Sequence, residues 1–413
     1  MNKTIDFIKT KVRILPFSCL PTGKYRVFGS GGGAHQVRLK LEDNPGTDFI
    51  GFMEHSAKTG QKDAQQCMDA AAATGRVILG TQTTEFQFNQ IKALLKNAEK
   101  IEQVYILDDF ADARRPENSK KKSETAILGW HSTVSAQQPI SQALQKHLQA
   151  AGWDLYQLSA LDLGTLSTMK RLQHVFIWNG QRDFFQPALS YLAARNIPVT
   201  YMEAGFFPQD QHFYLDRYGV NQKCRLMSDD LGWVGEKHLE RIRTTRDNFF
   251  GNISLLNEDY VLIPLQVPTD ANIVYCSRFT SGMQEFIDYI CDIYEGKERL
   301  VFKVHPKDPY NGQYRFYGHE TSDANFAELL SRAKKVHGIT SSTLYEAALA
   351  GIETISEGES LLNRHSHQVK KLLAAMIDRQ AHVNETDLSY WLRTYSNFAF
   401  DDRKSKRCPR WSE

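Results

Sequence analysis

Residues 261–273 read VLIPLQVPTDANI, an apolar run of strand length that ends in a turn with one carboxylate side chain. Strands this apolar are buried in parallel sheets, and open α/β sheets bind ligands at the carboxyl ends of their strands. Asp270 therefore stands where such a sheet places a catalytic group. The alternative is that Asp270 only caps the following element, which is a common role of Asp. The local sequence leaves both interpretations open.

Short apolar runs recur along the chain, and longer amphipathic or polar stretches separate them. Before residue 221 we expect strands at 12–17, 25–28, 76–79, 103–107, 154–158, 174–178 and 198–202, with helices at 87–100, 140–151 and 185–195. After it we expect strands at 260–267, 273–276, 300–304, 336–339 and 353–355. Strands that alternate with helices of this length predict βαβ units and parallel sheets, so the fold class is α/β with Rossmann-type domains.

The chain has 413 residues, 41% of them hydrophobic, which is too long for one ordinary domain. A polar, Arg-rich helical segment at 231–248 interrupts the alternation, so we expect the domain boundary near residues 250–257. The predicted domains are 1–252 and 253–385, followed by a C-terminal helix and basic tail at 386–413. Helical stretches at 361–381 and 385–397 are expected to cross back onto the first domain.

Composition excludes several classes of function. A net charge of +2 gives no field that favours nucleic acid, and the six cysteines form no CxxC pair and have no His partner at metal-ligand spacing. We therefore expect no metal site and a reducing cytoplasm. Neither a signal peptide nor an apolar window of about 18 residues is present, so no membrane span is expected. The basic runs at 120–122 and 403–410 are solvated surface or, in the alternative, contacts to anionic membrane lipid.

A glycine-rich run, GSGGG at residues 29–33, follows a predicted strand and invites a phosphate-loop interpretation. It matches neither G-x-G-x-x-G in full context nor G-x-x-x-x-G-K-[ST], and no clear helical pattern follows it. We therefore interpret it as a flexible turn.

Two further segments combine a strand end with groups that suit an anion. In KVHPKDP (303–309), Lys303 and His305 fall on the same side of an extended chain, where they are either a site for an anionic leaving group or incidental surface charge. In GITSSTLYEAALAG (338–351), a hydroxyl-rich turn precedes a helix. Ser342 or Thr343 can cap that helix, its N-terminus suits a phosphate, and Glu346 can accept hydrogen bonds from ribose.

Acidic residues also follow the strand predicted at 198–202. Glu203, in YMEAGFFP (201–208), stands at its carboxyl end and is predicted to point into a cleft between the domains. Asp216, in DRYGVN (216–221), is interpreted as a turn residue.

Taken together, these segments resemble the capsule polysaccharide biosynthesis family, the β-Kdo transferases of capsule and O-antigen assembly. The residues that carry the resemblance are Trp178–Gly180, Glu203–Pro208, Asp216–Asn221, Pro264–Gln266 with Asp270 and Ile273, Lys303–Pro306 and Ser341–Gly351. Their order and spacing match over roughly residues 170–360. The first 170 residues carry no motif that aligns.

The resemblance implies a GT-B-like pair of Rossmann-type domains that face a cleft, with acceptor binding in the first and CMP-sugar binding in the second. It implies CMP-Kdo as donor, a glycan or glycolipid acceptor, retention of the β configuration and no need for a metal or other cofactor. Asp270 takes the place of the family's nucleophile, Glu203 of its conserved Glu, and His305 of its His-Pro motif. Donor contacts are expected at Gln266, Ser277, Lys303, His305, Pro306, Ser341, Ser342, Thr343 and Glu346.

This chemistry is consistent with the residues. Loss of CMP builds oxocarbenium character that a close carboxylate stabilises and can trap, as in retaining glycosidases. The alternatives are another GT-B nucleotide-sugar enzyme, such as a sialic-acid-type transferase or an epimerase, and a non-catalytic scaffold of polysaccharide assembly. We expect a cytoplasmic protein, with contact to the inner membrane as a peripheral option.

Overall fold

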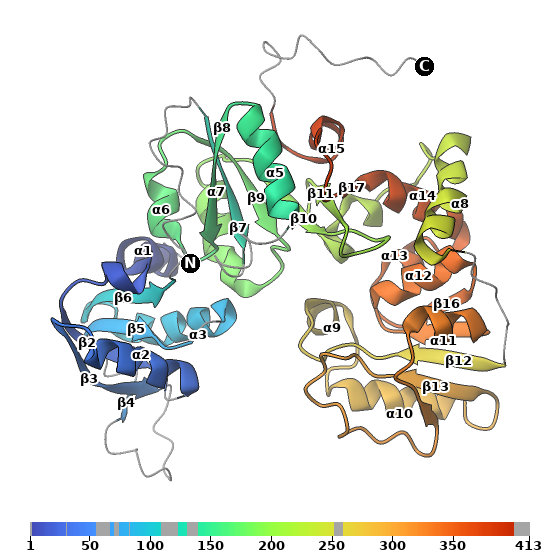
Figure 1. Ribbon diagram of the computed structural model, residues 1–413, viewed down its shortest axis with the longest axis horizontal. Helices are drawn as coiled ribbons and strands as arrows, with labels where there is room; N and C mark the ends of the chain where they lie inside the picture. Colours follow the sequence, from blue (N-terminus) through green and yellow to red (C-terminus); the bar gives the residue numbers. More distant parts are fainter. Residues whose placement is uncertain are drawn as a thin grey trace. The chain divides into compact units, whose positions relative to one another are not determined.

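The computed structural model describes residues 2–29, 31–54, 67–69, 74–81, 83–108, 123–129, 139–251 and 259–399. The chain forms two compact units: Met1–Tyr201 together with Asn384–Glu413, and Met202–Val383 (Figure 1). The boundary predicted near 250–257 lies largely outside the described residues, and the compact units instead divide between Tyr201 and Met202. The basic runs at 120–122 and 403–410 also lie outside the described residues.

The first unit begins with a parallel six-stranded sheet of order β1-β6-β5-β2-β3-β4. Its elements are α1 (Asn2–Lys11), β1 (Val12–Leu15), β2 (Gly23–Phe28), α2 (Gly32–Glu42), β3 (Thr47–Glu54), β4 (Cys67–Asp69), β5 (Gly75–Leu79), α3 (Thr84–Leu94) and β6 (Ile101–Leu107) (Figure 1). From β2 the chain runs outward through β3 and β4 on one side, and through β5 and β6 on the other. This order is that of a doubly wound Rossmann sheet, with β1 added at its edge.

The first unit also contains part of a six-stranded sheet, in the order β10-β9-β7-β8 and as far as Tyr201 of β10, and β7 pairs in parallel with β8 and β9. Its elements are β7 (Ser123–Gly129), α5 (Pro139–Ala150), β8 (Trp153–Ser159), α6 (Leu163–Thr168), β9 (Leu172–Trp178), α7 (Gln186–Ala193) and β10 (Val199–Ala204). The C-terminal helix α15 (Ser389–Tyr395) also belongs to this unit, and Phe398 stacks on Phe176 with ring centroids 5.7 Å apart. The predicted return of the C-terminal helices to the first domain is confirmed for the stretch at 385–397, whereas the stretch at 361–381 belongs to the second unit.

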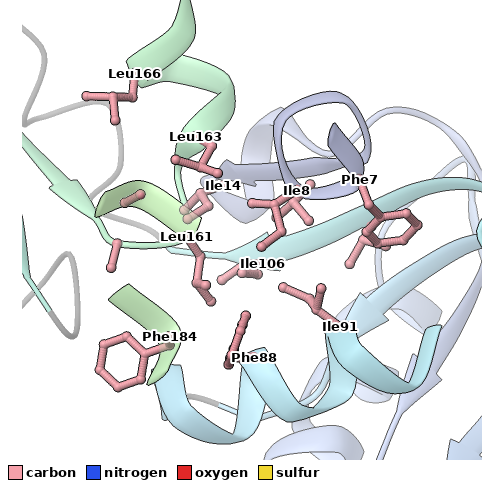
Figure 2. Close-up of a cluster of buried hydrophobic side chains, with 14 of the residues drawn as sticks. Phe7, Ile8, Ile14, Phe88, Ile91, Ile106, Leu161, Leu163, Leu166 and Phe184 are labelled. Atoms are coloured by element: carbon pink, nitrogen blue, oxygen red, sulfur yellow. The ribbon is translucent and has the colours of Figure 1, made fainter. Parts of the chain in front are cut away.

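One apolar core connects the two sheets of the first unit. Figure 2 shows side chains of α1, β1, α3 and β6 meeting those around α6, with Ile8, Ile106 and Leu161 at the centre. Ile8 and Leu161 are fully buried. Burying a large aliphatic side chain stabilises a fold by about 1.5–3 kcal/mol, so this core holds the first 107 residues to the second sheet.

The second unit is built on a parallel five-stranded sheet of order β14-β13-β12-β15-β16. Its elements are β11 (His212–Asp216), α8 (Glu236–Phe250), β12 (Tyr260–Pro264), α9 (Ala271–Cys276), α10 (Met283–Ile293), β13 (Arg299–Lys303), β14 (Glu320–Thr321), α11 (Phe326–Arg332), β15 (Lys335–Gly338), α12 (Ser342–Ala350), β16 (Glu353–Ser356), α13 (Leu361–Arg364), α14 (Val369–Arg379) and β17 (Gln380–His382). The apolar run is the central strand β12, where Val261, Leu262 and Ile263 are fully buried. The predicted α/β class, with parallel sheets in Rossmann-type domains, is confirmed.

Two local predictions are wrong. Residues 273–276, predicted as a strand because they are β-branched and aromatic, belong to helix α9, in which Ile273 and Cys276 are buried and Val274 and Tyr275 are exposed. That spacing is helical, and the cap at Asp270 starts the helix. The glycine-rich run is followed by helix α2, which its two initial glycines and weak amphipathic pattern concealed.

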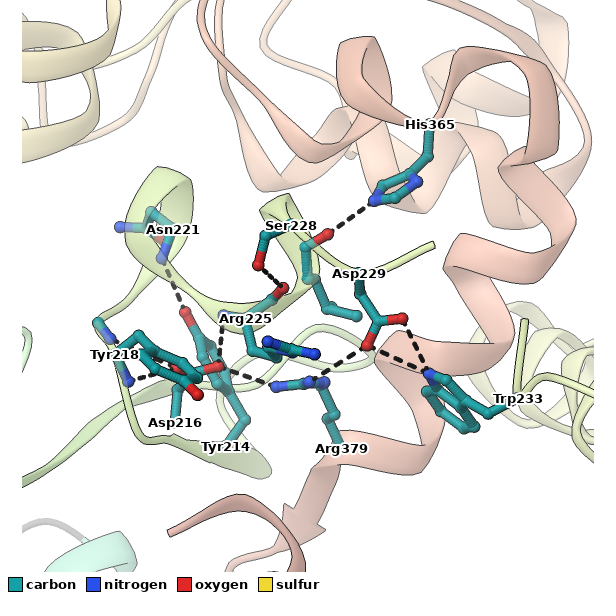
Figure 3. A network of polar contacts seen from close by, with 12 residues as sticks. Tyr214, Asp216, Tyr218, Asn221, Arg225, Ser228, Asp229, Trp233, His365 and Arg379 are labelled. Carbon is teal, nitrogen blue, oxygen red and sulfur yellow. Dashed lines mark hydrogen bonds and ion pairs between the residues drawn. The ribbon is translucent and has the colours of Figure 1, made fainter. Parts of the chain in front are cut away.

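A buried ion pair lies inside the second unit (Figure 3). Asp216, fully buried at the end of β11, accepts a bond from Nη1 of Arg379 at 2.8 Å. Its carboxylate also accepts backbone N–H bonds from Tyr218, Gly219 and Arg225. Burial raises the pKa of Asp216, and these bonds and Arg379 oppose that rise. The turn interpretation of Asp216 is therefore correct, but the turn is also tied to the end of α14.

We predict that Arg379→Met destabilises the protein by about 3–5 kcal/mol, because it leaves the Asp216 carboxylate buried without its cation. Arg243→Met is the control: Arg243 pairs with Asp247 on α8, and their side chains are 86% and 49% exposed, so the loss should stay below about 1 kcal/mol. Urea unfolding measures both. Equal losses in the two variants would contradict the importance of the buried pair.

Candidate functional site

A small cavity of about 50 Å³ lies in the second unit, at the carboxyl end of its central strands. The turn after β15 contributes Thr340 to its wall, and helix α12 contributes Ser342 and Tyr345. Glu203 lies near the end of β10, and Asn272 is the second residue of α9. Because four separate segments meet there, the cavity is the candidate functional site of this unit.

Asp270 is exposed and caps helix α9: its Oδ1 accepts the backbone N–H of Asn272 at 2.7 Å. Asp270 therefore has the capping role that the sequence allowed. Asp270 itself does not line the cavity, but Asn272 and Cys276 of the helix that it caps do. Burial, with the negative charges of Glu359 and Asp270, raises the pKa of the Cys276 thiol to about 12. Capping and chemistry are compatible, since a carboxylate that accepts one bond keeps a second oxygen.

Glu203 is half-buried, lines the cavity and accepts the backbone N–H of Ala204 at 3.0 Å. The next position but one, residue 205, requires glycine because no side chain fits there: a Cβ would lie 2.4 Å from Cβ of His212. The next two residues are fixed by Gln380, whose Oε1 accepts the N–H groups of Phe206 and Phe207 at 2.9 and 3.0 Å. The segment that follows Glu203 at the end of β10 is thus held by the first residue of β17.

The opposite wall is the hydroxyl-rich turn before α12. Gln266, buried behind it, accepts the backbone N–H of Thr340 at 2.9 Å and fixes the turn to the segment that follows β12. Ser341 caps α12 by accepting the N–H of Thr343. Thr343 Oγ1 also donates to Ser341 Oγ at 2.7 Å. The first turn of α12 thus presents hydroxyl groups and a helix N-terminus, which suit a phosphate.

The His-Pro segment lies on the neighbouring strand. Lys303 ends β13 in register with Pro264 of β12, and its Nζ donates to the carbonyl of Ala324 at 2.7 Å. His305 accepts the backbone N–H of Lys307 on Nδ1 at 3.1 Å, and Pro306 is exposed. Ser277 accepts the N–H of Phe279. These four residues are not in the wall of the cavity, which holds Glu203 and Ser342 of the predicted set.

Glu346 lies one turn inside α12 and is half-buried. Burial raises the pKa of its carboxyl to about 7. A carboxyl that titrates near neutral pH beside a proposed phosphate site can switch between donating and accepting a hydrogen bond. The sequence indicated this residue only as a ribose contact.

Sequence reasoning missed several residues of the wall. Asn272 lies beside Asp270, and its Oδ1 is buried without a hydrogen-bond partner among the residues that the structure describes. Glu359 and Ser360 enter from the turn after β16, and Gly358 there packs so closely that a Cβ would lie 2.3 Å from Thr340. Asn272 could have been found, since it belongs to the same polar turn as Asp270. The turn after β16 carried no motif.

Within the described ranges, no group of three or more His, Cys, Asp or Glu side chains is placed to hold a metal ion. Within the same ranges, no helix combines the length and apolar character that a membrane crossing needs.

No family model matches the sequence. The protein FixF of Sinorhizobium fredii is 26% identical over 268 residues, which are 60% of this chain, and this chain spans only 60% of FixF. Solved structures of the KpsC β-Kdo 2,7 and β-Kdo 2,4 transferases of Thermosulfurimonas dismutans align with TM-scores of 0.47 and 0.46 at 15% identity. Each alignment covers 62% of this chain, and 92% and 91% of the KpsC chains.

A UDP-GlcNAc 2-epimerase of Methanocaldococcus jannaschii aligns over 64% of this chain and 93% of its own, with a TM-score of 0.26 and 13% identity. Similarities at these levels do not assign an activity, so any assignment depends on the residues of the site.

We predict that Glu346→Gln stabilises the protein increasingly as pH rises from 5 to 8. The folded protein holds the Glu346 proton up to a pKa of about 7, whereas the unfolded chain releases it at the lower, ordinary pKa. Wild-type stability therefore falls across this window by up to about 3 kcal/mol, and the variant is spared that loss. Urea unfolding at several pH values measures the difference. Glu328→Gln, on the exposed side of α11, is the control. A pH-independent difference for Glu346→Gln would contradict the raised pKa.

Proposed function

We propose that this chain is a retaining glycosyltransferase that moves β-Kdo from CMP-Kdo to a glycan or glycolipid hydroxyl. One observation carries the proposal: a half-buried carboxylate, Glu203, and the hydroxyl-rich start of α12 line one cavity, and Asp270 caps helix α9, whose Asn272 and Cys276 line the same cavity. Two carboxylates and an anion-binding helix start are the groups that this transfer needs. The ordered motifs from Trp178 to Gly351 support the choice of sugar.

The first step is a displacement at the anomeric carbon. A carboxylate oxygen of Asp270 forms a bond to that carbon, while the bond from the carbon to the phosphate oxygen of CMP breaks and its electron pair leaves with CMP. The departing phosphate needs neutralisation more than protonation. Lys303, His305 and the N–H and hydroxyl groups of Ser341–Thr343 are proposed for this role. Gln266 acts by positioning the turn that carries Thr340.

The second step returns the sugar to an acceptor. Glu203 takes the proton of the acceptor hydroxyl, the hydroxyl oxygen bonds to the anomeric carbon, and the Asp270 carboxylate leaves with its electron pair. Two displacements retain the β configuration, and no metal enters either step. The acceptor site and a peripheral contact with the inner membrane stay predictions.

We predict that Asp270→Asn abolishes transfer, with a loss on the order of a thousandfold or more, while the protein stays folded. Asn caps a helix as well as Asp does, so the bond to Asn272 survives and only the nucleophile is lost. Release of CMP from CMP-Kdo with a mixed glycan and glycolipid acceptor panel measures transfer, and thermal unfolding checks the fold. Asp292→Asn, exposed on α10, is the control.

Retained activity in Asp270→Asn would refute the nucleophile. The donor is tested in the same assay with CMP-sialic acid and UDP-GlcNAc, from which the wild-type chain should release no nucleotide. Turnover of either in place of CMP-Kdo would refute the proposed donor.

A further inference from the structure

A larger cavity, of about 490 Å³, lies in the first unit, between the glycine-rich run and the end of strand β5. Its wall includes Gly31 and Gln36 of the α2 region, Gly80 and Thr81 after β5, and Gln90 of α3. Pockets that hold small molecules and cofactors have volumes of about 300–1,000 Å³. The proposed transferase site belongs to the other unit and uses none of these residues.

The place of this cavity in the sheet is informative. Strands β2 and β5 are parallel neighbours, and the chain leaves β2 toward β3 on one side and β5 toward β6 on the other. The carboxyl ends of two such strands form a topological switch point, where open α/β sheets bind their ligands. The cavity lies at that point.

Glycine is required at several places around the cavity. Gly29 has a φ of +108°, which side chains rarely adopt. A Cβ at Gly33 would lie 2.6 Å from the Gly80 carbonyl oxygen, and one at Gly80 would lie 2.6 Å from Cβ of Ala34. The helix start therefore packs directly on the end of β5. Gly29, Gly31 and Ala34 occur at the G-x-G-x-x-A spacing of loops that bring a backbone close to a diphosphate.

The cavity offers hydrogen-bonding groups that are not used. Helix α2 has 11 residues, and no described side chain caps its N-terminus at Gly31, so its first N–H groups lack the usual partner. Gln90 is only 8% exposed, and its Nε2 donates to the carbonyl of Phe28 at 3.0 Å. The Oε1 of Gln90 is buried without a hydrogen-bond partner among the described residues. A buried acceptor of this kind destabilises the fold unless a ligand donor meets it.

The residues of the cavity wall also indicate how a charged ligand would be bound. Of the described residues that line the cavity, none carries a charged side chain. An anion would therefore be bound by backbone N–H groups and the positive end of the α2 dipole, as in dinucleotide-binding folds. The unused Gln90 acceptor suits a hydroxyl or amino donor on the same ligand.

We propose that the first unit holds a second nucleotide site, which binds the diphosphate of a nucleoside diphosphate at the start of α2 and its nucleoside in the cavity beside Gln90. The source of the nucleoside diphosphate is either a dinucleotide or a nucleotide sugar, and the titrations below separate the two. This site does not depend on the transferase assignment. It gives the first 107 residues, which carry no transferase motif, a ligand of their own.

Calorimetric titration of the full chain with NAD⁺, UDP-GlcNAc, ADP, CMP and inorganic pyrophosphate tests the proposal. If the ligand is a dinucleotide, we expect NAD⁺ and ADP each to bind; if it is a nucleotide sugar, we expect UDP-GlcNAc to bind. CMP should not compete for the site in either case. Asp270→Asn should bind the same ligand as tightly as the wild-type chain. The proposal is overturned if none of NAD⁺, UDP-GlcNAc and ADP binds. It is also overturned if inorganic pyrophosphate binds as tightly as these nucleotides do.

Charge variants of Gln36 assign the binding to this cavity. Gln36 is exposed on α2, so Glu, Ala and Lys fit there without repacking. The affinity should fall about two- to fivefold in Gln36→Glu and rise by a similar factor in Gln36→Lys, with Gln36→Ala between them. Equal affinities in all three variants overturn the location.

A second variant, Gly31→Asp, adds a side chain where a Cβ meets no atom within 4 Å, and Asp is a favourable helix cap. It should abolish binding while the thermal unfolding temperature stays the same or rises. Undiminished binding in this variant also overturns the proposal.

Discussion

The buried bond between Asp216 and Arg379 fixes the part of the second unit on which its cavity depends. Arg379 ends helix α14, and the next residue, Gln380, binds the N–H groups of Phe206 and Phe207. Two adjacent side chains therefore hold the turn after β11 and the loop that carries Glu203. Tyr214, on the strand between them, lines the cavity and accepts the N–H of Asn221. If residues 379 and 380 shift, this whole wall shifts with them.

The opposite wall of the cavity is held by hydrogen bonds between Gln266 and Thr340. Gln266 is the first polar side chain after the apolar β12 run, and it fixes the turn before α12 through Thr340. Asp270 follows four residues later and starts α9. A single stretch of chain thus builds the centre of the sheet, positions the hydroxyl-rich turn and ends in the proposed nucleophile. The cost of burying Gln266 is met by two hydrogen bonds to one residue.

The sequence predicted the features that are local. Apolar β12, the capped start of α12 and the position of Glu203 near the carboxyl end of β10 follow from periodicity and cap residues. It could not predict the bond from Arg379 to Asp216 or from Gln266 to Thr340, because the partners are 163 and 74 residues apart. The strand prediction for residues 273–276 was wrong because their β-branched and aromatic side chains were given more weight than the helical spacing of the buried ones. Strands β3, β7 and β11 were missed, and helix α2 was hidden because glycine at its start disfavours a helix that packing against β5 permits.

In the proposed mechanism, Asp270 carries the sugar between donor and acceptor. Intact-protein mass spectrometry of Glu203→Gln after incubation with CMP-Kdo tests it directly, because loss of the base should block the second displacement and let the adduct accumulate. We predict a mass increase of one Kdo that peptide mapping assigns to Asp270 and that disappears in Glu203→Gln/Asp270→Asn. No mass increase in Glu203→Gln, or an adduct that persists in the double variant, would contradict it.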